Sequence, residues 1–313
     1  MISVVIPLYN KADSIARTIA SVRAQSVLDW ELVVVDDGSR DDGATIVRAI
    51  DDPRIRLVTQ ENAGVSAARN RGAQEACTEW VSFLDADDYW APDHLDNLLG
   101  LIKRFPNAAL CATAYKKVDE SGNVRKIRLR HEGEGNYLMA SYFSDVLDVE
   151  HPVHSSAVAV KKEKLAELGG FPLGVKAGED IIMWARLACA GDLAYSGRAT
   201  ASYVLPPVSV GARDAVIRHP QTPDYVGAAL AELRSQCCRH GASIALFEAD
   251  WHRIRAMLFL ELNERRASLS ELQRAVALSR LRLKDVICCG LLALPLTWRR
   301  QVLASLRRNR GRG

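Results

Sequence analysis

The sequence has no uninterrupted apolar run of roughly 18 residues, the length that a membrane-spanning helix requires. It begins MISVVIPLYN, without the basic segment and small-residue cleavage site of a secretory signal. Its seven cysteines include no CxxC pair, so we expect neither a zinc site nor a disulfide framework. These absences predict a cytoplasmic protein whose cysteines are reduced.

Three common motifs of α/β enzymes are also missing. No GxGxxG follows the first apolar segment and no GxxxxGK[ST] occurs anywhere, which argues against dinucleotide-dependent dehydrogenases and P-loop enzymes. A GxSxG motif is absent as well, which argues against an α/β-hydrolase.

The net positive charge of the chain comes from its C-terminal end. The net charge is +3, but residues 280–313 contain nine basic residues and one acid, so this tail carries +8 and residues 1–279 carry −5. A mildly acidic body argues against nucleic acid as the main partner. Two readings of the tail remain open. The apolar segment 285–296 and the basic residues after it either lie on an anionic membrane surface, with Trp298 at the headgroups, or form an ordinary capping helix with a frayed end.

The rest of the composition is that of a globular protein. The 313 residues are 48% hydrophobic and 25% charged, enough for one large domain or a domain with an appendage. The first 115 residues alternate between short apolar runs and segments of helical periodicity. This alternation predicts a parallel sheet with helices on both faces. The expected strands are 2–8, 31–37, 54–59, 80–85 and 108–115, and the expected helices are 13–25, 41–50, 64–77 and 91–105.

Beyond residue 115 the pattern is less regular. Residues 116–150 are polar and predict loops or a short hairpin at the sheet edge. The pattern then favours a strand followed by a helix over 155–168, a glycine-rich loop over 169–180, a helix over 181–191, a strand over 195–205 and helices after Pro207. Ser268 and Glu271 form a capping-box pattern. We therefore predict an α/β domain over 1–210, in halves 1–115 and 116–210, and a helical C-terminal extension with a basic tail over 211–313.

Acidic side chains follow the expected strands at the edge where a doubly wound sheet binds ligands. Asp36 and Asp37 end the second strand, and Asp85, Asp87 and Asp88 follow the fourth. Clustered carboxylates select hard cations such as Mg²⁺ or Mn²⁺, whose shells substrate phosphates often complete. A metal–diphosphate is the expected ligand. The alternative is that individual carboxylates only shape turns or begin helices.

Six segments occur together in the order and spacing of a known family. They are VVIPLYN (4–10), VVVDDGSRDD (33–42), NAGVSAARNRG (62–72), VSFLDADDYW (81–90), GGF (169–171) and GED (178–180). Over residues 1–205 the chain therefore resembles the family 2 glycosyltransferases. The resemblance implies a GT-A fold and an inverting transfer of sugar from a nucleotide-diphosphate sugar, most often a UDP-sugar, to a hydroxyl of a glycan or lipid-linked acceptor. It also implies a role in bacterial polysaccharide biosynthesis at the cell envelope. Under the membrane reading of the tail, this cytoplasmic enzyme would be peripheral on the inner face of the cell membrane.

The resemblance also implies roles for individual residues. In the DADD segment, Asp85 would contact the sugar or ribose, and Asp87 or Asp88 would hold Mg²⁺ or Mn²⁺. Asp180 would be the catalytic base, with Glu179 beside it. The residues implied to contact the nucleotide-sugar are Pro7, Tyr9, Asn10, Asp36, Asp37, Asn62 and Arg69. Among them, Asp37 would accept a hydrogen bond from the uracil N3–H. Weaker candidates on the acceptor side are His154, Ser155, Trp184 and Arg186.

Two other functions remain as alternatives. A sugar nucleotidyltransferase also uses paired aspartates with Mg²⁺, but it usually has a glycine-rich basic loop after the first strand, where this sequence reads PLYNKADS. A non-catalytic protein that binds sugar nucleotides is the second, and the intact DADD and GED segments argue against it.

Overall fold

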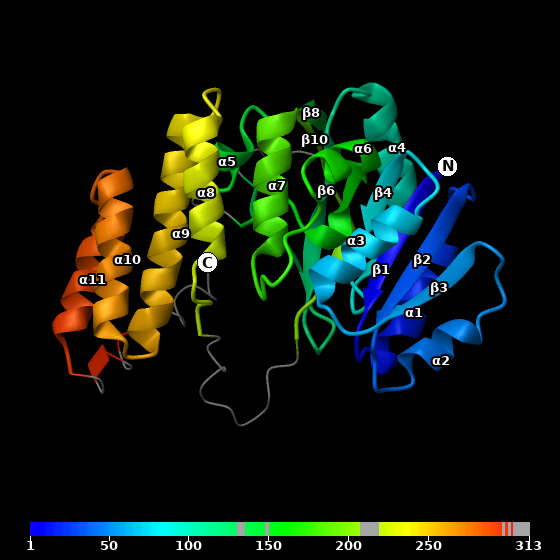
Figure 1. Ribbon diagram of the computed structural model, residues 1–313, viewed down its shortest axis with the longest axis horizontal. Helices are drawn as coiled ribbons and strands as arrows, with labels where there is room; N and C mark the ends of the chain where they lie inside the picture. Colours follow the sequence, from blue (N-terminus) through cyan, green and yellow to red (C-terminus); the bar gives the residue numbers. More distant parts are fainter. Residues whose placement is uncertain (130–134, 148–149, 207–218, 296–297, 300–301, 303–313) are drawn as a thin grey trace. The chain divides into compact units, whose positions relative to one another are not determined.

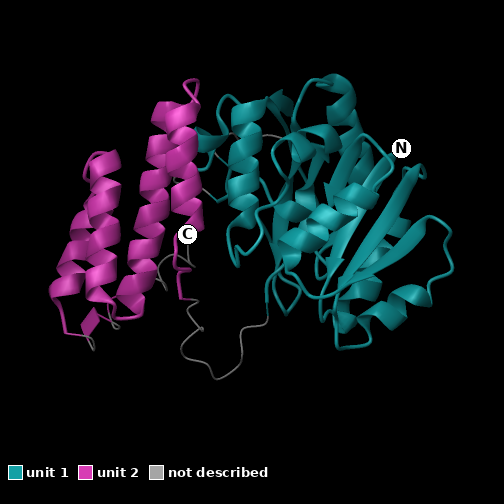
Figure 2. Cartoon of the chain, viewed as in Figure 1, with its two compact units in different colours: residues 1–207 teal, residues 208–313 magenta. Residues whose placement is uncertain are grey.

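The computed structural model describes residues 1–129, 135–147, 150–206, 219–295, 298–299 and 302. The chain divides into two compact units, Met1–Pro207 and Val208–Gly313 (Figure 2). We refer to them as unit 1 and unit 2.

Unit 1 is built on one sheet with the strand order β3-β2-β1-β4-β9-β6-β10-β5 (Figure 1). Strands β1, β2, β3 and β4 are parallel, whereas β9 is antiparallel to both of its neighbours, β4 and β6. The short strands β7 and β8 pair with β6 and β10. The strands are β1 (Ile2–Leu8), β2 (Trp30–Asp37), β3 (Ile55–Gln60), β4 (Trp80–Phe83), β5 (Tyr89–Trp90), β6 (Leu110–Val118), β7 (Val124–Lys126), β8 (Asn136–Leu138), β9 (Val158–Lys161) and β10 (Leu193–Val204).

Side-chain alternation along β1 explains why both faces of the sheet are covered. Val4 and Ile6 belong to a buried cluster with apolar residues of α1 and α4. Val5 points to the other face, where α3 approaches so closely that a side chain at Gly72 would overlap it. A strand that is buried on both faces reads as a continuous apolar run, as this one does. The helices of the unit are α1 (Ala12–Arg23), α2 (Gly43–Arg48), α3 (Val65–Glu75), α4 (His94–Arg104), α5 (Tyr142–Asp145), the 3-10 turn η1 (Ser155–Ala157), α6 (Lys162–Glu167) and α7 (Glu179–Ala190).

The predicted mostly parallel α/β sheet is confirmed, and the predicted strands and helices of the first half lie within a few residues of the observed ones. Two features were not predicted. The segment Tyr89–Trp90 forms a two-residue edge strand on β10, and β9 enters the sheet between β4 and β6 in the opposite direction. Both are set by long-range pairing, which local periodicity does not record.

Four helices are described between residues 219 and 295 of unit 2, and α9 contacts the other three. They are α8 (Tyr225–Gln236), α9 (Gly241–Glu261), α10 (Arg265–Leu278) and α11 (Leu283–Ala293). A small apolar cluster of Ala256, Leu260, Leu272, Cys288 and Leu291 joins α9, α10 and α11. Among the described helices, none is both long and apolar enough to cross a membrane.

The structure corrects two details of the sequence reading of unit 2. Ser268 and Glu271 do not cap a helix, because α10 already begins at Arg265; Ser268 Oγ instead donates to the Ala256 carbonyl and Glu271 pairs with residues of α9. Arg299, assigned to the lipid-facing tail, is buried and donates to main-chain carbonyls, including that of Leu291. The other tail arginines that follow it lie outside the described residues.

Candidate active site

The guanidinium of Arg69 connects two segments that lie far apart in the sequence. Arg69, on α3, donates from Nη2 to Asp85 at 2.7 Å and from Nη1 to Glu179 at 2.9 Å. It is 3% exposed and also lies over the ring of Phe171. The burial of such a cation is compensated by its two carboxylate partners. The DADD segment and the GED segment are therefore held against each other by one side chain.

Asp85 follows β4 and keeps part of its carboxylate open to solvent, with a side chain 28% exposed. Burial by itself raises the pKa of Asp85, but the charge and hydrogen bond of Arg69, together with nearby His154 and Lys11, outweigh it, so the net pKa lies below the ordinary value. Asp85 is thus ionised at neutral pH. Its main-chain N–H donates to Ser156 Oγ, which ties it to the start of β9.

Asp88 is enclosed by protein. Its Oδ2 accepts from Ser156 Oγ at 2.5 Å, its Oδ1 accepts from the Val204 N–H at 2.9 Å, and its side chain is 1% exposed. Burial, assisted by the nearby charge of Asp85, raises the pKa of Asp88 well above its ordinary value. These contacts connect the segment after β4 to the turn that precedes β9 and to β10.

Asp87 is the exposed member of the trio. Its carboxylate accepts from Lys11 Nζ at 2.6 Å, and its side chain is 37% exposed. The backbone around it is held by α1, because Arg17 donates to the Asp87 carbonyl and Thr18 to the Asp88 carbonyl. The segment is rigidly placed, while the carboxylate of Asp87 itself remains accessible.

Asp180 lies in the first turn of α7, directly after the Arg69 partner Glu179. Gly178 precedes the helix in a left-handed conformation, with φ of 85°. Burial raises the pKa of Asp180, and the Arg69 charge opposes this without reversing it. Burial likewise raises the pKa of Glu179, with the charge of Asp180 as the second cause. Asp180 is therefore a more basic carboxylate than one in water and lies within electrostatic range of Asp85.

The loop that leads into α7 is anchored on α3. Asn70 and Phe171 exchange two hydrogen bonds, from Asn70 Nδ2 to the Phe171 carbonyl at 2.8 Å and from the Phe171 N–H to Asn70 Oδ1 at 2.7 Å. Gly170 has φ of 73°, and a Cβ there would lie 2.6 Å from Asn70 Oδ1. The neighbouring residues Arg69 and Asn70 of α3 thus position the whole 169–180 segment.

The residues expected to bind the nucleotide lie at the ends of β1 and β2. Asp37 is 3% exposed, and its carboxylate accepts from the N–H groups of Ala63 and Gly64 and from Gln60 Nε2. Asn62 Nδ2 donates to the Asp37 carbonyl. The carboxylate expected to bind the base therefore orders the loop between β3 and α3.

The loop after β1 is tied to the loop after β2. The Asn10 N–H donates to Ser39 Oγ, and Asn10 Oδ1 accepts from the Arg40 N–H. Asn10 itself has φ of 52°. Asp36 accepts from the Ser39 N–H, Pro7 is half-buried, and Tyr9 is 45% exposed. An exposed ring beside a fixed loop is available to contact a ligand.

The acceptor-side candidates differ in their exposure and in their distance from the DADD segment. His154 lies 3.9 Å from Asp88 and packs between Tyr115 and Tyr203; burial lowers its pKa to about 4, so it is neutral at pH 7. Ser155 is buried at 2% exposure. Trp184 is fully buried against Phe171 and has no surface to offer an acceptor. Arg186, on the same helix, is half-buried.

Three residues that the sequence reading passed over hold the site together: Lys11, Asn70 and Ser156. Lys11 directly follows the VVIPLYN segment, and Asn70 lies inside NAGVSAARNRG directly after Arg69, but neither residue type indicates its partner. Ser156 is next to the proposed Ser155, and the turn η1 rather than strand alternation decides which serine points to Asp88. Pairing partners 68 or more residues apart are not readable from local pattern.

The donor set fits a hard divalent cation. Asp85 and Asp87 supply carboxylate oxygens with partial exposure, and carboxylate oxygen is the ligand that Mg²⁺ and Mn²⁺ prefer. The ammonium of Lys11 on Asp87 shows that this position already attracts positive charge. Asp88, whose oxygens both accept from protein groups, is not open to a metal in this arrangement.

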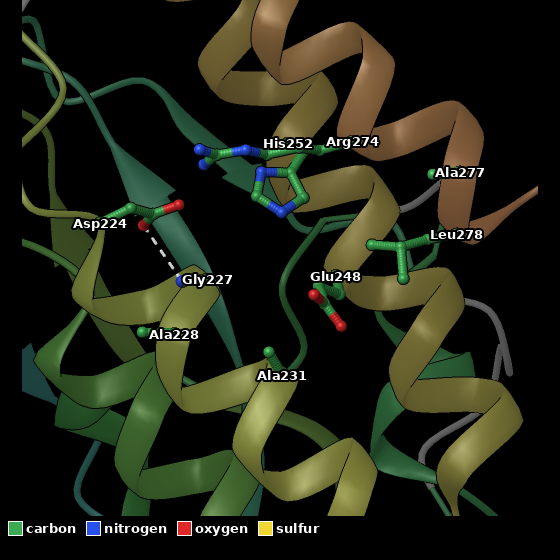
Figure 3. A pocket seen from close by; sticks show the side chains of 9 residues that line it. All are labelled: Asp224, Gly227, Ala228, Ala231, Glu248, His252, Arg274, Ala277 and Leu278. Atoms are coloured by element: carbon green, nitrogen blue, oxygen red, sulfur yellow. Dashed lines mark hydrogen bonds between the residues drawn. The ribbon is translucent and has the colours of Figure 1, made fainter.

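A second group of potential ligands lies in unit 2. Asp224, His252 and Glu271 approach one another closely. Asp224 and His252 line a cavity of about 460 Å³ between α8, α9 and α10 (Figure 3). Arg255 donates from Nε to Glu271 at 3.0 Å and lies 3.2 Å from Asp224, and His252 Nδ1 lies 2.6 Å from Glu271. Both carboxylates already pair with Arg255, and Trp251 and His252 add further contacts. The carboxylate oxygens are therefore committed to protein partners rather than open to a cation.

Comparison with known proteins agrees with this architecture. The family model described as Glycosyl transferase family 2 matches residues 3–168. An uncharacterized glycosyltransferase of Rickettsia felis is 29% identical over 191 residues, covering 60% of this chain and 30% of the relative. The putative teichuronic acid biosynthesis glycosyltransferase TuaG of Bacillus subtilis is 36% identical over 125 residues, covering 39% of this chain and 49% of the relative. The chain spans about a third of the length of the Rickettsia relative.

A solved structure extends the likeness over nearly the whole chain. The crystal structure of S. aureus TarS 1–349 in complex with UDP-GlcNAc superposes with a TM-score of 0.68 at 17% identity, covering 96% of this chain and 91% of that one. At this identity the likeness establishes the fold, a GT-A α/β sheet with C-terminal helices. Because the family model covers more than half of the residues, the chain belongs to glycosyl transferase family 2, a family of transferase enzymes.

Proposed function

We propose that the protein is an inverting glycosyltransferase that moves a sugar from a nucleotide-diphosphate sugar to a hydroxyl of a glycan or lipid-linked acceptor. The observation that carries the proposal is the double ion pair of Arg69, which brings the segment of Asp180 against the segment of Asp85 and Asp87. An in-line displacement needs a base and a leaving-group site on opposite sides of one sugar, and these two segments supply them.

The chemistry follows from the charges. The acceptor oxygen attacks the anomeric carbon, the bond from that carbon to the diphosphate breaks, and the configuration inverts. Asp180 takes the proton of the attacking hydroxyl, a role for which its raised pKa suits it. The nucleoside diphosphate departs with the bonding electron pair, and the Asp180 proton passes to solvent before the next turnover.

Asp87 would hold the divalent cation, with Asp85 directed to the sugar or ribose. Such a cation supplies charge stabilisation for the leaving diphosphate. Lys11 pairs with Asp87, so it must give up that contact or share it when a cation binds there. Asp37 and Tyr9 would contact the base, which requires part of the loop at 60–64 to release the Asp37 carboxylate.

The relatives support both the donor class and the biological setting. TarS has been crystallised with UDP-GlcNAc and with UDP, and it shares the fold. TuaG and the succinoglycan biosynthesis protein ExoO of Rhizobium meliloti, which is 42% identical over 99 residues covering 31% of this chain and 28% of the relative, are named for polysaccharide synthesis. We therefore propose a UDP-sugar donor and an acceptor of the cell-envelope polysaccharide class.

The test is a panel of nucleotide sugars screened with and without Mn²⁺, first by thermal shift and then by nucleotide release. One UDP- or dTDP-sugar should stabilise the protein only when the metal is present. With that sugar, Asp180→Asn should lower turnover roughly a hundredfold to ten-thousandfold, the usual contribution of a positioned base. Asp93→Asn is the matched control, because Asp93 is an exposed aspartate paired with Arg198 outside the site.

Two outcomes would overturn the proposal. Equal turnover of Asp180→Asn and the wild type would remove the assigned base. Release of pyrophosphate from a nucleoside triphosphate and a sugar phosphate, in place of nucleoside diphosphate from a nucleotide sugar, would identify a nucleotidyltransferase.

A further inference from the structure

Helix α11 exposes an apolar stripe. Leu283, Val286 and Ile287 are 75%, 51% and 44% exposed, and Gly290 and Ala293 continue the same helical spacing. The opposite face packs into unit 2 through Asp285, Cys288 and Leu291. The outer face of a helix in a globular unit is normally polar, because only the inner face is removed from water. This outer face is apolar instead.

The stripe extends beyond both ends of the helix. Leu281 is 61% exposed before it and Trp298 is 65% exposed after it. The position of Trp298 is fixed by its neighbour Arg299, whose guanidinium is 1% exposed and donates to the carbonyl oxygens of Leu291 and Leu294. We call the exposed side chains of Leu281, Leu283, Val286, Ile287 and Trp298 the α11 surface.

The exposed charges on the segment that carries the α11 surface have one sign, and the nearby carboxylate of Asp250 on α9 is paired with Arg253 and Arg282. Within the described part of residues 280–302 the single acid is Asp285, which is 2% exposed and accepts from Arg253 Nε at 2.7 Å. Burial raises its pKa, but the hydrogen bonds and charges of Arg253 and Arg282 together outweigh burial, so the pKa lies below the ordinary value. Arg280 and Lys284 are exposed on the same segment. The segment therefore presents apolar side chains with cations beside them and no exposed carboxylate of its own.

We propose that the α11 surface binds an anionic phospholipid bilayer, with α11 lying in the plane of the interface. A helix of 11 residues is only about 16 Å long and does not cross a bilayer. Its apolar side chains enter the boundary of the acyl chains, Trp298 lies at the headgroups, and Arg280 and Lys284 are attracted to lipid phosphates. Two copies of the chain meeting through this surface would bring their like cations together, which disfavours a dimer here.

The test is sedimentation of the full chain with vesicles of phosphatidylcholine alone or mixed with phosphatidylglycerol, at low and high salt. It needs no sugar donor, so its result is independent of the proposed transfer activity. The protein should bind the mixed vesicles, lose binding at high salt, and bind phosphatidylcholine weakly. The emission of Trp298, taken as the difference from Trp298→Phe, should shift to shorter wavelength on binding.

A matched pair of variants tests whether vesicle binding depends on the α11 surface. Ile287→Asp should weaken binding to mixed vesicles about tenfold or more, because it removes one apolar side chain from the interface and adds a like charge to the lipid. Val276→Asp places the same charge at a 39% exposed apolar position of α10 and should leave binding unchanged. Circular dichroism of both variants verifies that unit 2 is folded.

Three results would overturn the proposal. The first is equal binding of Ile287→Asp and Val276→Asp to the mixed vesicles. The second is an absence of preference for phosphatidylglycerol. The third is that the wild type does not bind vesicles but self-associates in solution, and that Ile287→Asp abolishes this self-association. The last result would assign the α11 surface to a second copy of the chain.

Discussion

Arg69 Nη1 donates to Glu179 Oε1 at 2.9 Å, although 110 positions separate the two residues in the sequence. The same guanidinium holds Asp85 at 2.7 Å. Glu179 is next to the proposed base and Asp85 opens the DADD segment, so one buried cation sets the spacing between the two halves of the candidate active site. A change at Arg69 therefore alters both stability and the charge state of the site.

Replacing Arg69 by methionine should destabilise unit 1 by about 3 kcal/mol, because the buried Glu179 and the partly exposed Asp85 lose their counter-charge. Arg71→Met is the control. Arg71 is two positions away on the same helix, is half exposed, and pairs with Glu75 at the surface, so its replacement should cost less than about 1 kcal/mol. Chemical unfolding followed by circular dichroism measures both. Equal losses for the two variants would show that the Arg69 pairs do not stabilise the fold.

Substitution of Asp87 should affect metal binding, whereas substitution of Asp88 should affect the stability of the fold. Asp87→Ala should abolish the Mn²⁺-dependent stabilisation by the sugar donor and change the unfolding free energy by at most about 1 kcal/mol, since its pair with Lys11 is exposed. Asp88→Ala leaves the buried Val204 N–H and Ser156 hydroxyl without their acceptor and should cost about 1–3 kcal/mol for each. Thermal shift with and without Mn²⁺ distinguishes the two effects. Metal dependence that survives in Asp87→Ala would refute the assigned ligand.

Glu179→Gln should move the acidic limb of the pH–rate profile to lower pH. A base must be ionised to act, and burial has raised the pKa of Asp180. Removing the Glu179 charge takes away a like charge beside Asp180 and leaves the Arg69 cation less neutralised, and both effects favour the ionised base. The measurement is kcat/KM against pH for this variant and the wild type. An unchanged limb, or one displaced to higher pH, would mean that Asp180 does not control it.

Local pattern was sufficient for most of the sheet and for the identity of the acidic groups. Strands β1 and β2 were evident because burial on both faces leaves a run of apolar residues without alternation. The direction of β9 and the two-residue strand at Tyr89 depend on pairing with β4, β6 and β10, which no local window contains.

The candidate site was predictable to a similar extent. The aspartates of the DADD and GED segments could be named from the sequence, but their different environments could not. Asp87 is accessible and Asp88 is buried because Ser156 and Val204, both distant in the sequence, surround the second and not the first. The division of roles between two adjacent carboxylates is a property of tertiary packing, and sequence spacing alone does not record it.

Asp180→Asn should stabilise the fold at neutral pH while it removes activity. The folded-state pKa of Asp180 is raised by burial, so the folded chain holds the proton more tightly than the unfolded chain does. The stability associated with the protonated group is present at low pH and is lost as the pH rises through the raised pKa. Asparagine is neutral at every pH and keeps an oxygen for the Ile181 N–H, which donates to Asp180 at 2.8 Å.

The melting temperature of Asp180→Asn should therefore exceed that of the wild type at neutral pH, and the difference should shrink as the pH falls toward the ordinary range of an aspartate. Asp93→Asn provides the comparison, because Asp93 is exposed and paired with Arg198 and should show no such gain. A melting temperature of Asp180→Asn at or below the wild-type value at neutral pH would contradict the raised pKa. In that case the attraction of Arg69, rather than burial, would determine the pKa of Asp180.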